Sequence, residues 1–184
     1  VPADMPAGLT LVDVRREETL KSAEALGIHR VVWLGYEDSG MTGWEQNSLP
    51  GAFCNASLDE AAHKLAAVLR EENADVLTTY DWHGGYGHPD HKMAHQATAM
   101  AIRQYRRAKK RAPQFWVLSE PGERFDVAIG NKTTAKFKRA ALEAHSSQVS
   151  IFAETYSVSN AEIRYDEPER IRKANPSPDR KSVV

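Results

Sequence analysis

The chain has 184 residues, of which 41% are hydrophobic and 27% charged, a composition typical of one globular domain that folds without disulfides. Its 24 Lys and Arg residues balance 25 Asp and Glu residues, and the net charge of -1 argues against nucleic acid or an anionic membrane as a partner. The single cysteine, Cys54, excludes an internal disulfide, is predicted to be structural and favours a cytoplasmic setting. No apolar run reaches the ~20 residues of a membrane helix, and no signal-peptide pattern is present.

Helical and strand-like segments alternate along the first part of the chain. Residues 1–8 are predicted to be loop because they hold two prolines and a glycine. Apolar spacing predicts a helix over 13–26 that ends at Gly27, and the apolar run VVWLG predicts a buried strand over 31–35. The polar, glycine-rich connection 36–55 is longer than most and is therefore a candidate functional loop.

The same alternation continues through the middle of the chain. Ser57 and Glu60 form the pattern of a capping box at the start of the next helix. Beyond that helix, the sequence predicts strands over 75–80 and 115–118, a helix that Asp90 caps and that ends near residue 109, and a helix over 132–144.

This order of elements predicts an α/β fold with a mostly parallel sheet. In such sheets ligands bind beyond the carboxyl ends of the strands, where the two glycine-rich loops 36–55 and 81–89 are expected to lie. We expect one domain over residues 1–165. Residues 166–184 are predicted to form a polar, poorly ordered tail.

The loop DWHGGYGHPDH, residues 81–91, carries the strongest chemical signal. It places three histidines, two aspartates and a tyrosine around three glycines, which allow sharp turns and close approach to a ligand. His91 falls in the first turn of the following helix, so its ring is held by a rigid element. Metal binding or acid–base chemistry is therefore predicted for His88 and His91.

The other histidines have simpler interpretations. We expect His83 to be a surface residue, although it belongs to the same loop. His95 follows His91 at the i, i+4 spacing of zinc-binding helices, but a packed or hydrogen-bonded role is favoured. His145, near a predicted helix end, fits an interaction with the helix dipole.

Three further features have both a functional and a structural interpretation. Asp38 follows a predicted strand and could orient a hydroxyl-rich substrate, but an ordinary Asx turn is favoured. Arg15 is a candidate substrate-binding residue, although arginines at such positions are usually solvated. The basic run 103–111 holds six Lys or Arg residues, and a solvated helix end is favoured over a nucleic-acid patch.

The stretch TTYDWHGGYGHPDH resembles the second signature of the LmbE-like (PIG-L) deacetylase family. Three other segments are similar to family patterns: Arg15-x-x-Glu18, LGYEDSGM, and KRAALEAHSSQ with His145 and Gln148. The resemblance covers about residues 15–148. It lies closest to the branch of GlcNAc-inositol deacetylases and mycothiol conjugate amidases.

The resemblance implies a Rossmann-like three-layer fold and a zinc-dependent hydrolase that removes an N-acyl group from a glucosamine-type conjugate. It implies that His91 binds the metal and that His88, helped by Tyr86, stabilises the oxyanion or protonates the leaving amine. By the same resemblance Asp90 orients a histidine by hydrogen bonding. Arg15, Asp38 and Gln148 are the implied substrate-binding residues.

The chain departs from the family in one respect, because no HPDD motif occurs in it. In the family this motif supplies a metal histidine, a metal aspartate and the general base. We therefore expect a strand–helix–strand unit of roughly 30 or more residues to be missing before Val1. The 184 residues alone are then expected to be nearly inactive, with an exposed sheet edge that a homo-oligomer could cover.

The expected partner is a small amino-sugar conjugate, with neither nucleic acid nor a membrane. The alternative is a truncated, inactive family member that binds a sugar conjugate or a protein.

Overall fold

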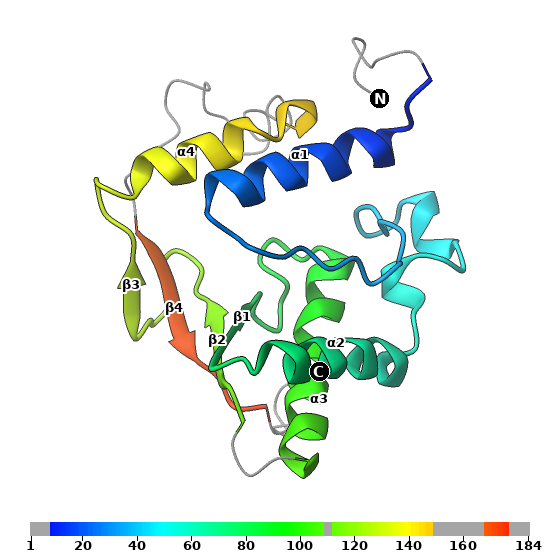
Figure 1. Cartoon of the computed structure of the whole chain (residues 1–184). Helices are drawn as coiled ribbons and strands as arrows, with labels where there is room; N and C mark the ends of the chain where they lie inside the picture. The colour runs from blue at the N-terminus through cyan, green and yellow to red at the C-terminus, as the bar shows by residue number, and fades with distance from the viewer. Residues whose placement is uncertain (1–7, 109–111, 149–167, 177–184) are drawn as a thin grey trace. The chain divides into compact units, whose positions relative to one another are not determined.

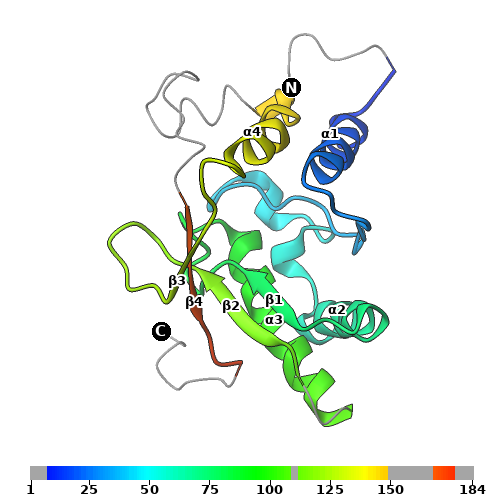
Figure 2. The ribbon, with the colours of Figure 1, turned by 60° about the vertical axis from the view of Figure 1, so that its left-hand side comes forward.

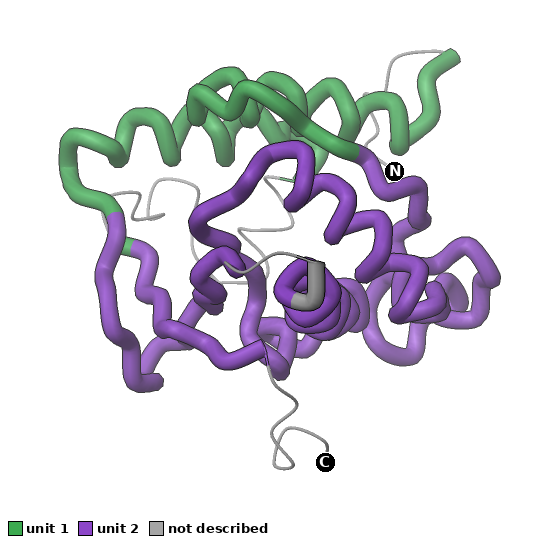
Figure 3. The backbone as a smooth tube through the Cα atoms, turned by 60° about the horizontal axis from the view of Figure 1, so that its bottom comes forward, with its two compact units in different colours: residues 1–32, 130–168 green, residues 33–129, 169–184 purple. Residues whose placement is uncertain are grey.

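The computed structural model describes residues 8–108, 112–148 and 168–176. Its backbone divides into two compact units (Figure 3). The first unit comprises residues 1–32 and 130–168, and the second comprises 33–129 and 169–184. The predicted boundary between residues 165 and 166 lies outside the described residues, as do the loop 1–7, the end of the basic run at 109–111 and the last residues of the predicted tail.

The first unit is built on α1 (Leu11–Ala25) and α4 (Ala135–Glu143), which lie side by side (Figure 1). Thr10 and Asp13 form a capping box at the start of α1. Gly27, at φ +70°, follows the helix end, so the predicted helix and its terminator are confirmed. After α4 a short 3-10 turn spans Ser146–Gln148.

A buried glutamate joins the two helical segments of the first unit. Glu18 on α1 is 4% exposed, and its carboxylate accepts hydrogen bonds from both Ser146 and Ser147. The Ser147 backbone N–H also donates to it at 2.7 Å. Burial raises the pKa of Glu18, but the hydrogen bonds from Ser147 and Ser146 together lower it by more than burial raises it. The net pKa is below its usual value, so the carboxylate is ionised at neutral pH.

The second unit contains two long helices and a four-stranded sheet. Short 3-10 helices at Glu45–Ser48 and Phe53–Asn55 lie in the loop before α2. Ser57 caps α2, as predicted, and its hydroxyl accepts the Glu60 N–H at 3.4 Å. Among the described residues, no helix is long and apolar enough to cross a bilayer. The elements are α2 (Leu58–Glu72), β1 (Val76–Thr79), α3 (Pro89–Ala108), β2 (Gln114–Leu118), β3 (Val127–Ile129) and β4 (Glu169–Lys173).

The main hydrophobic core lies where α2 and α3 meet the sheet. Small residues on α2, such as Ala62 and Ala66, allow α3 to approach closely, and both are fully buried. Ile102 and Tyr105 of α3 and Val117 of β2 complete the contact. This packing fixes α3 against β1 and β2, and with them the loop that joins β1 to α3.

The sheet is mixed, with strand order β1-β2-β4-β3 (Figure 2). β1 and β2 are parallel, whereas β4 runs antiparallel to both β2 and β3. The α/β class is therefore confirmed, but the prediction of a mostly parallel sheet is wrong for the described residues. The reason is that the two antiparallel pairs come from β4, a strand that the sequence did not predict.

β4 lies within the predicted polar tail, and that prediction is wrong for residues 169–173. Its sequence, ERIRK, has one apolar residue, Ile171, which is 7% exposed. The residues on either side of it are charged, so the sequence lacks the apolar residues that predict a strand. The long aliphatic stems of Arg and Lys nevertheless pack well beside a sheet.

The predicted strand over residues 31–35 is also wrong, because this segment has no regular structure. Val32 and Trp33 are 38% and 48% exposed. A strand requires a neighbouring strand to accept its backbone hydrogen bonds. Within the part of the chain that is described, no strand pairs with this segment, and the nearby pairing is one isolated bridge between Glu37 and Ala52.

Candidate active site

The loop from Asp81 to His88 joins β1 to α3 and turns sharply at its glycines. Gly84 has φ +76°, a conformation that L side chains rarely adopt. A Cβ atom at this position would lie 2.9 Å from the backbone nitrogen of Lys92. Glycine is therefore required here, and it lets the loop pack directly against the first turn of α3.

His88 caps α3. Pro89 is the first residue of the helix, and the Asp90 backbone N–H donates to His88 Nδ1 at 3.2 Å. The structure thus gives His88 the capping role predicted for Asp90. Since Nδ1 accepts this hydrogen bond, the neutral ring carries its proton on Nε2. His88 therefore presents an N–H donor at the end of the loop.

His91 is held in the opposite tautomer. Its Nδ1 lies 3.1 Å from the Gly84 carbonyl oxygen, which can only accept, so Nδ1 carries the proton and Nε2 keeps its lone pair. The Tyr80 ring stacks flat on the imidazole, with centroids 3.6 Å apart and planes 4° apart. Burial lowers the pKa of His91 below its usual value, which favours the neutral ring that a metal requires.

Asp90 connects α3 to the loop 36–55. Its carboxylate accepts hydrogen bonds from the Ser39 backbone N–H at 3.0 Å and from the Ser39 hydroxyl. Ser39 is fully buried and also accepts the Cys54 N–H at 2.9 Å. The carboxylate of Asp90 thus contacts a serine, whereas its backbone N–H contacts His88. That Asp90 orients a histidine by hydrogen bonding stays a prediction.

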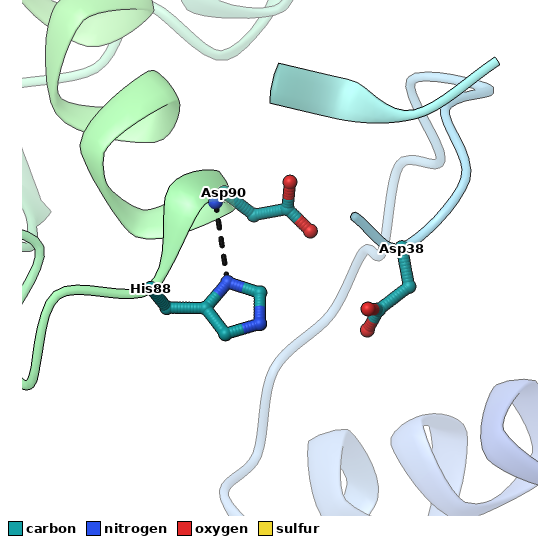
Figure 4. Close-up of side chains that lie close together, drawn as sticks. All are labelled: Asp38, His88 and Asp90. Carbon is teal, nitrogen blue, oxygen red and sulfur yellow. Dashed lines mark hydrogen bonds between the residues drawn. The ribbon is translucent and has the colours of Figure 1, made fainter. Parts of the chain in front are cut away.

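Asp38 forms the Asx turn that the sequence offered as its structural interpretation, accepting the Gly40 N–H at 2.6 Å. Its exposed carboxylate also faces the imidazole of His88 (Figure 4). Ligand atoms of Asp38, His88 and Asp90 all lie within 4.8 Å of one another. Asp38 thus combines a turn-forming role with a position at the edge of this cluster.

The hydrogen bonds discriminate between two kinds of metal ligand. A metal on His88 Nε2 would require a proton on Nδ1, which would then oppose the Asp90 N–H. His91 meets the requirement without change, because its Nδ1 proton already has an acceptor and Nε2 is available. The donor set therefore fits a metal at His91 and a hydrogen-bonding role at His88.

The other aromatic and histidine side chains of the loop are also placed. Tyr86 is 61% exposed and lies edge-on to His88 and His91, with ring centroids 6.1 and 5.2 Å away. The side chain of His83 is 48% exposed, as predicted. His95 faces the Tyr80 carbonyl oxygen from Nδ1 at 2.9 Å, which confirms its predicted hydrogen-bonded role.

Two predicted substrate-binding residues belong to the first unit. Arg15 is half-buried on α1, and Gln148 ends the 3-10 turn after α4. His145 lies before this turn, and its charge contributes to the lowered pKa of Glu18. The roles of Arg15 and Gln148 stay predictions.

Sequence reasoning missed three residues that shape the site: Tyr80, Asp81 and Ser39. Tyr80 and Asp81 lie at the end of β1, where the sequence predicted only a strand and a loop. An Asp followed by glycines three and four positions later is the available signal for Asp81, since its carboxylate accepts their N–H groups. Ser39 has no such signal, because its partner Asp90 is distant in sequence.

Comparisons with known proteins identify relatives of this chain. Residues 3–102 match the family model PIG-L, described as GlcNAc-PI de-N-acetylase. A 1D-myo-inositol 2-acetamido-2-deoxy-alpha-D-glucopyranoside deacetylase of Nocardiopsis dassonvillei is 33% identical to the chain, over 82% of the chain and 68% of the relative. The enzyme of that name from Thermobifida fusca is 47% identical, over 51% of the chain and 34% of its own length. The aligned part thus spans about a third of the Thermobifida relative. The chain belongs to the PIG-L family.

Proposed function

We propose that this chain carries part of the active site of a zinc-dependent hydrolase that removes the N-acetyl group from a glucosamine conjugate. The relatives named above are deacetylases of a GlcNAc-inositol compound. The observation that carries the proposal is the pair of opposite tautomers: His91 offers a lone pair, and His88, three residues earlier, offers an N–H.

His91 would hold the metal through Nε2, together with ligands from outside the set that the structure describes. When bound, zinc lowers the pKa of a water molecule towards ~7 and so supplies a nucleophile at neutral pH. We place His88 Nε2–H at the acyl carbonyl oxygen, where it stabilises developing negative charge.

The remaining side chains bind and orient the substrate in this proposal. The exposed Asp38 carboxylate is suited to accept hydrogen bonds from sugar hydroxyls beside His88. Tyr86, edge-on to both imidazoles, covers the reacting group and helps His88. Asp90 keeps the loop that carries Asp38 fixed to α3 through Ser39. Arg15 and Gln148 are proposed to contact the sugar.

Two histidine variants test the proposal, measured on the protein in its full natural length with the GlcNAc-inositol compound as substrate. We expect His91→Ala to lose zinc and activity together. His88→Ala should retain zinc but react about 100- to 1000-fold more slowly, the usual cost of removing one oxyanion donor. His63→Ala, an exposed histidine on α2, is the matched control and should change neither.

Zinc content and steady-state rates decide the outcome. Full activity in either variant overturns the assignment of that histidine. A wild-type protein that binds the sugar conjugate, does not bind zinc and does not hydrolyse the amide supports the binding-domain alternative instead.

A further inference from the structure

The loop of the candidate site contains a deeply buried carboxylate. Asp81, the residue directly after Tyr80, is 2% exposed. Its Oδ1 accepts the backbone N–H groups of Gly84 at 3.0 Å and of Gly85 at 3.1 Å. A carboxylate buried at this depth loses much hydration, so these hydrogen bonds are needed to keep it ionised.

The Gly85 N–H and the Gly84 carbonyl belong to the same peptide group. In a trans peptide the two bonds lie in one rigid plane and point in opposite directions. At one edge of this peptide group Asp81 accepts the Gly85 N–H. At the opposite edge the Gly84 oxygen accepts the His91 Nδ1–H at 3.1 Å. Fixing the first hydrogen bond therefore fixes the direction of the second.

The second oxygen of Asp81 contacts one residue of the loop and one of β4. This atom, Oδ2, contacts His83 Nδ1 at 3.1 Å and lies 3.6 Å from Arg172 Nη2 on β4. Arg172 also binds Glu123 at 2.8 Å. Asp81, His83 and Glu123 have the spacing of a cation site, but the Arg172 guanidinium already supplies the positive charge there.

We propose that Asp81 is a positioning residue that acts on His91 through the Gly84–Gly85 peptide. By holding this peptide, the carboxylate keeps His91 in the Nδ1–H tautomer and leaves Nε2 available to a metal. The metal part of this inference rests on the proposed function. Carboxylates often hydrogen-bond directly to metal-binding imidazoles, and here one peptide group lies between the two. The hydrogen bond from the Gly85 N–H to the Asp81 carboxylate makes the carbonyl of the same peptide a stronger acceptor for His91.

A second contact separates this role from that of a general loop stabiliser. Tyr80 stacks flat against His91 and sets the plane of the ring, but a stacked ring leaves the choice of protonated nitrogen undetermined. Only the Gly84 carbonyl distinguishes the two nitrogens among the contacts described for His91. Losing Asp81 should therefore change the tautomer of a ring that stays stacked.

Long-range nitrogen–proton NMR spectra of the metal-free protein, with the signals of His91 assigned by comparison with His91→Gln, test the inference directly. In the wild type we expect the proton of His91 on Nδ1 and that of His88 on Nε2. In Asp81→Ala a large share of the His91 proton should move to Nε2. His95 serves as an internal reference, since its Nδ1 faces the Tyr80 carbonyl and should be unaffected.

Zinc affinity, measured by competition with a chromophoric chelator, is the second readout. Asp81→Ala should bind zinc about 10- to 100-fold more weakly, the usual effect of losing an outer partner of a metal ligand. Asp81→Asn keeps an acceptor for the glycine N–H groups and should restore the tautomer and most of the affinity. His83→Ala removes a neighbour of Oδ2 but leaves Oδ1 in place, so it is the matched control and should behave as the wild type.

The outcomes are distinct. A wild-type His91 with its proton on Nε2 overturns the inference without any variant, which matters if Asp81→Ala does not fold. A folded Asp81→Ala that keeps the Nδ1–H tautomer also overturns it. A shifted tautomer with unchanged zinc affinity supports the positioning role and instead contradicts His91 as the metal ligand, which is the failure of the proposed function.

Discussion

At the scale of single residues, backbone groups rather than other side chains decide what the two histidines can do. A backbone N–H sets the tautomer of His88, and a backbone carbonyl sets that of His91. The sequence predicts that both residues are functional, because histidines in a glycine-rich loop are typical of active sites. It does not predict which nitrogen is protonated, since that depends on the path of the backbone through Gly84 and Pro89.

The glycines of this loop allow a matched test of steric demand. Gly84 and Gly87 have φ values of +76° and +94°, so alanine is strained by about 1–2 kcal/mol at either position. At Gly84 the added Cβ also meets the Lys92 nitrogen at 2.9 Å, whereas at Gly87 nothing lies within 4 Å. We expect Gly84→Ala to lower the free energy of unfolding in urea clearly more than Gly87→Ala. Equal losses would contradict the close packing of the loop on α3.

At the scale of elements, a single carboxylate ties α1 to the turn after α4. Glu18 is buried and accepts three hydrogen bonds from residues Ser146 and Ser147, which lie far from it in sequence. Its neighbour Glu17 is exposed and pairs with Lys21 one helical turn away. Buried hydrogen bonds to a charged group contribute about 1.5–3 kcal/mol, whereas exposed helix pairs are screened by water and contribute far less.

Replacing each glutamate in turn measures this difference. Glu18→Gln should increase the hydrogen-exchange rate of the Ser147 amide by about tenfold or more, because roughly 1.4 kcal/mol of protection corresponds to a factor of ten. Glu17→Gln, the control, should change that rate by less than a factor of about three. If the two variants exchange alike, Glu18 does not hold the turn.

The elements also show where prediction from the sequence succeeds and where it fails. Helices α1 to α4 are predicted because their apolar spacing is a local signal. The segment 31–35 has the composition of a strand, yet it lacks a strand to pair with in the described residues. β4 has the opposite character, since its composition is that of a solvated tail but β2 and β3 both pair with it. Pairing is a non-local property, so neither error could be corrected from local sequence.

At the scale of the whole molecule, two buried carboxylates make stability depend on pH. The pKa of Asp81 is raised by burial, but hydrogen bonds from Gly85 and His83 and the charge of Arg172 lower it below its usual 3.8. Glu18 likewise lies below its usual 4.5. During acidification the unfolded chain therefore takes up protons before the folded one, which favours unfolding. The stabilisation is complete above the usual pKa values and is lost as the pH falls through the lowered ones.

Asp81→Asn tests this dependence by removing the titrating group. At neutral pH the variant should be less stable than the wild type by about 1–3 kcal/mol, the cost of weakening a buried charged hydrogen bond. The difference should narrow as the pH is lowered below the usual value of 3.8, because the wild-type carboxylate becomes neutral too. Urea unfolding over a series of pH values measures it, and a constant difference would contradict an ionised Asp81.

The position of β4 has a consequence for synthesis on the ribosome. β2 pairs with β4 and not with β3, which precedes β4 in the chain. The four-stranded sheet therefore cannot be completed until residues 169–173 have left the ribosome. Until then β2 exposes an unpaired edge, and Asp81 is without the cation that Arg172 supplies. The loop that holds His88 and His91 would thus be among the last parts to settle, which makes a nascent chain stalled before residue 169 prone to chaperone binding and aggregation.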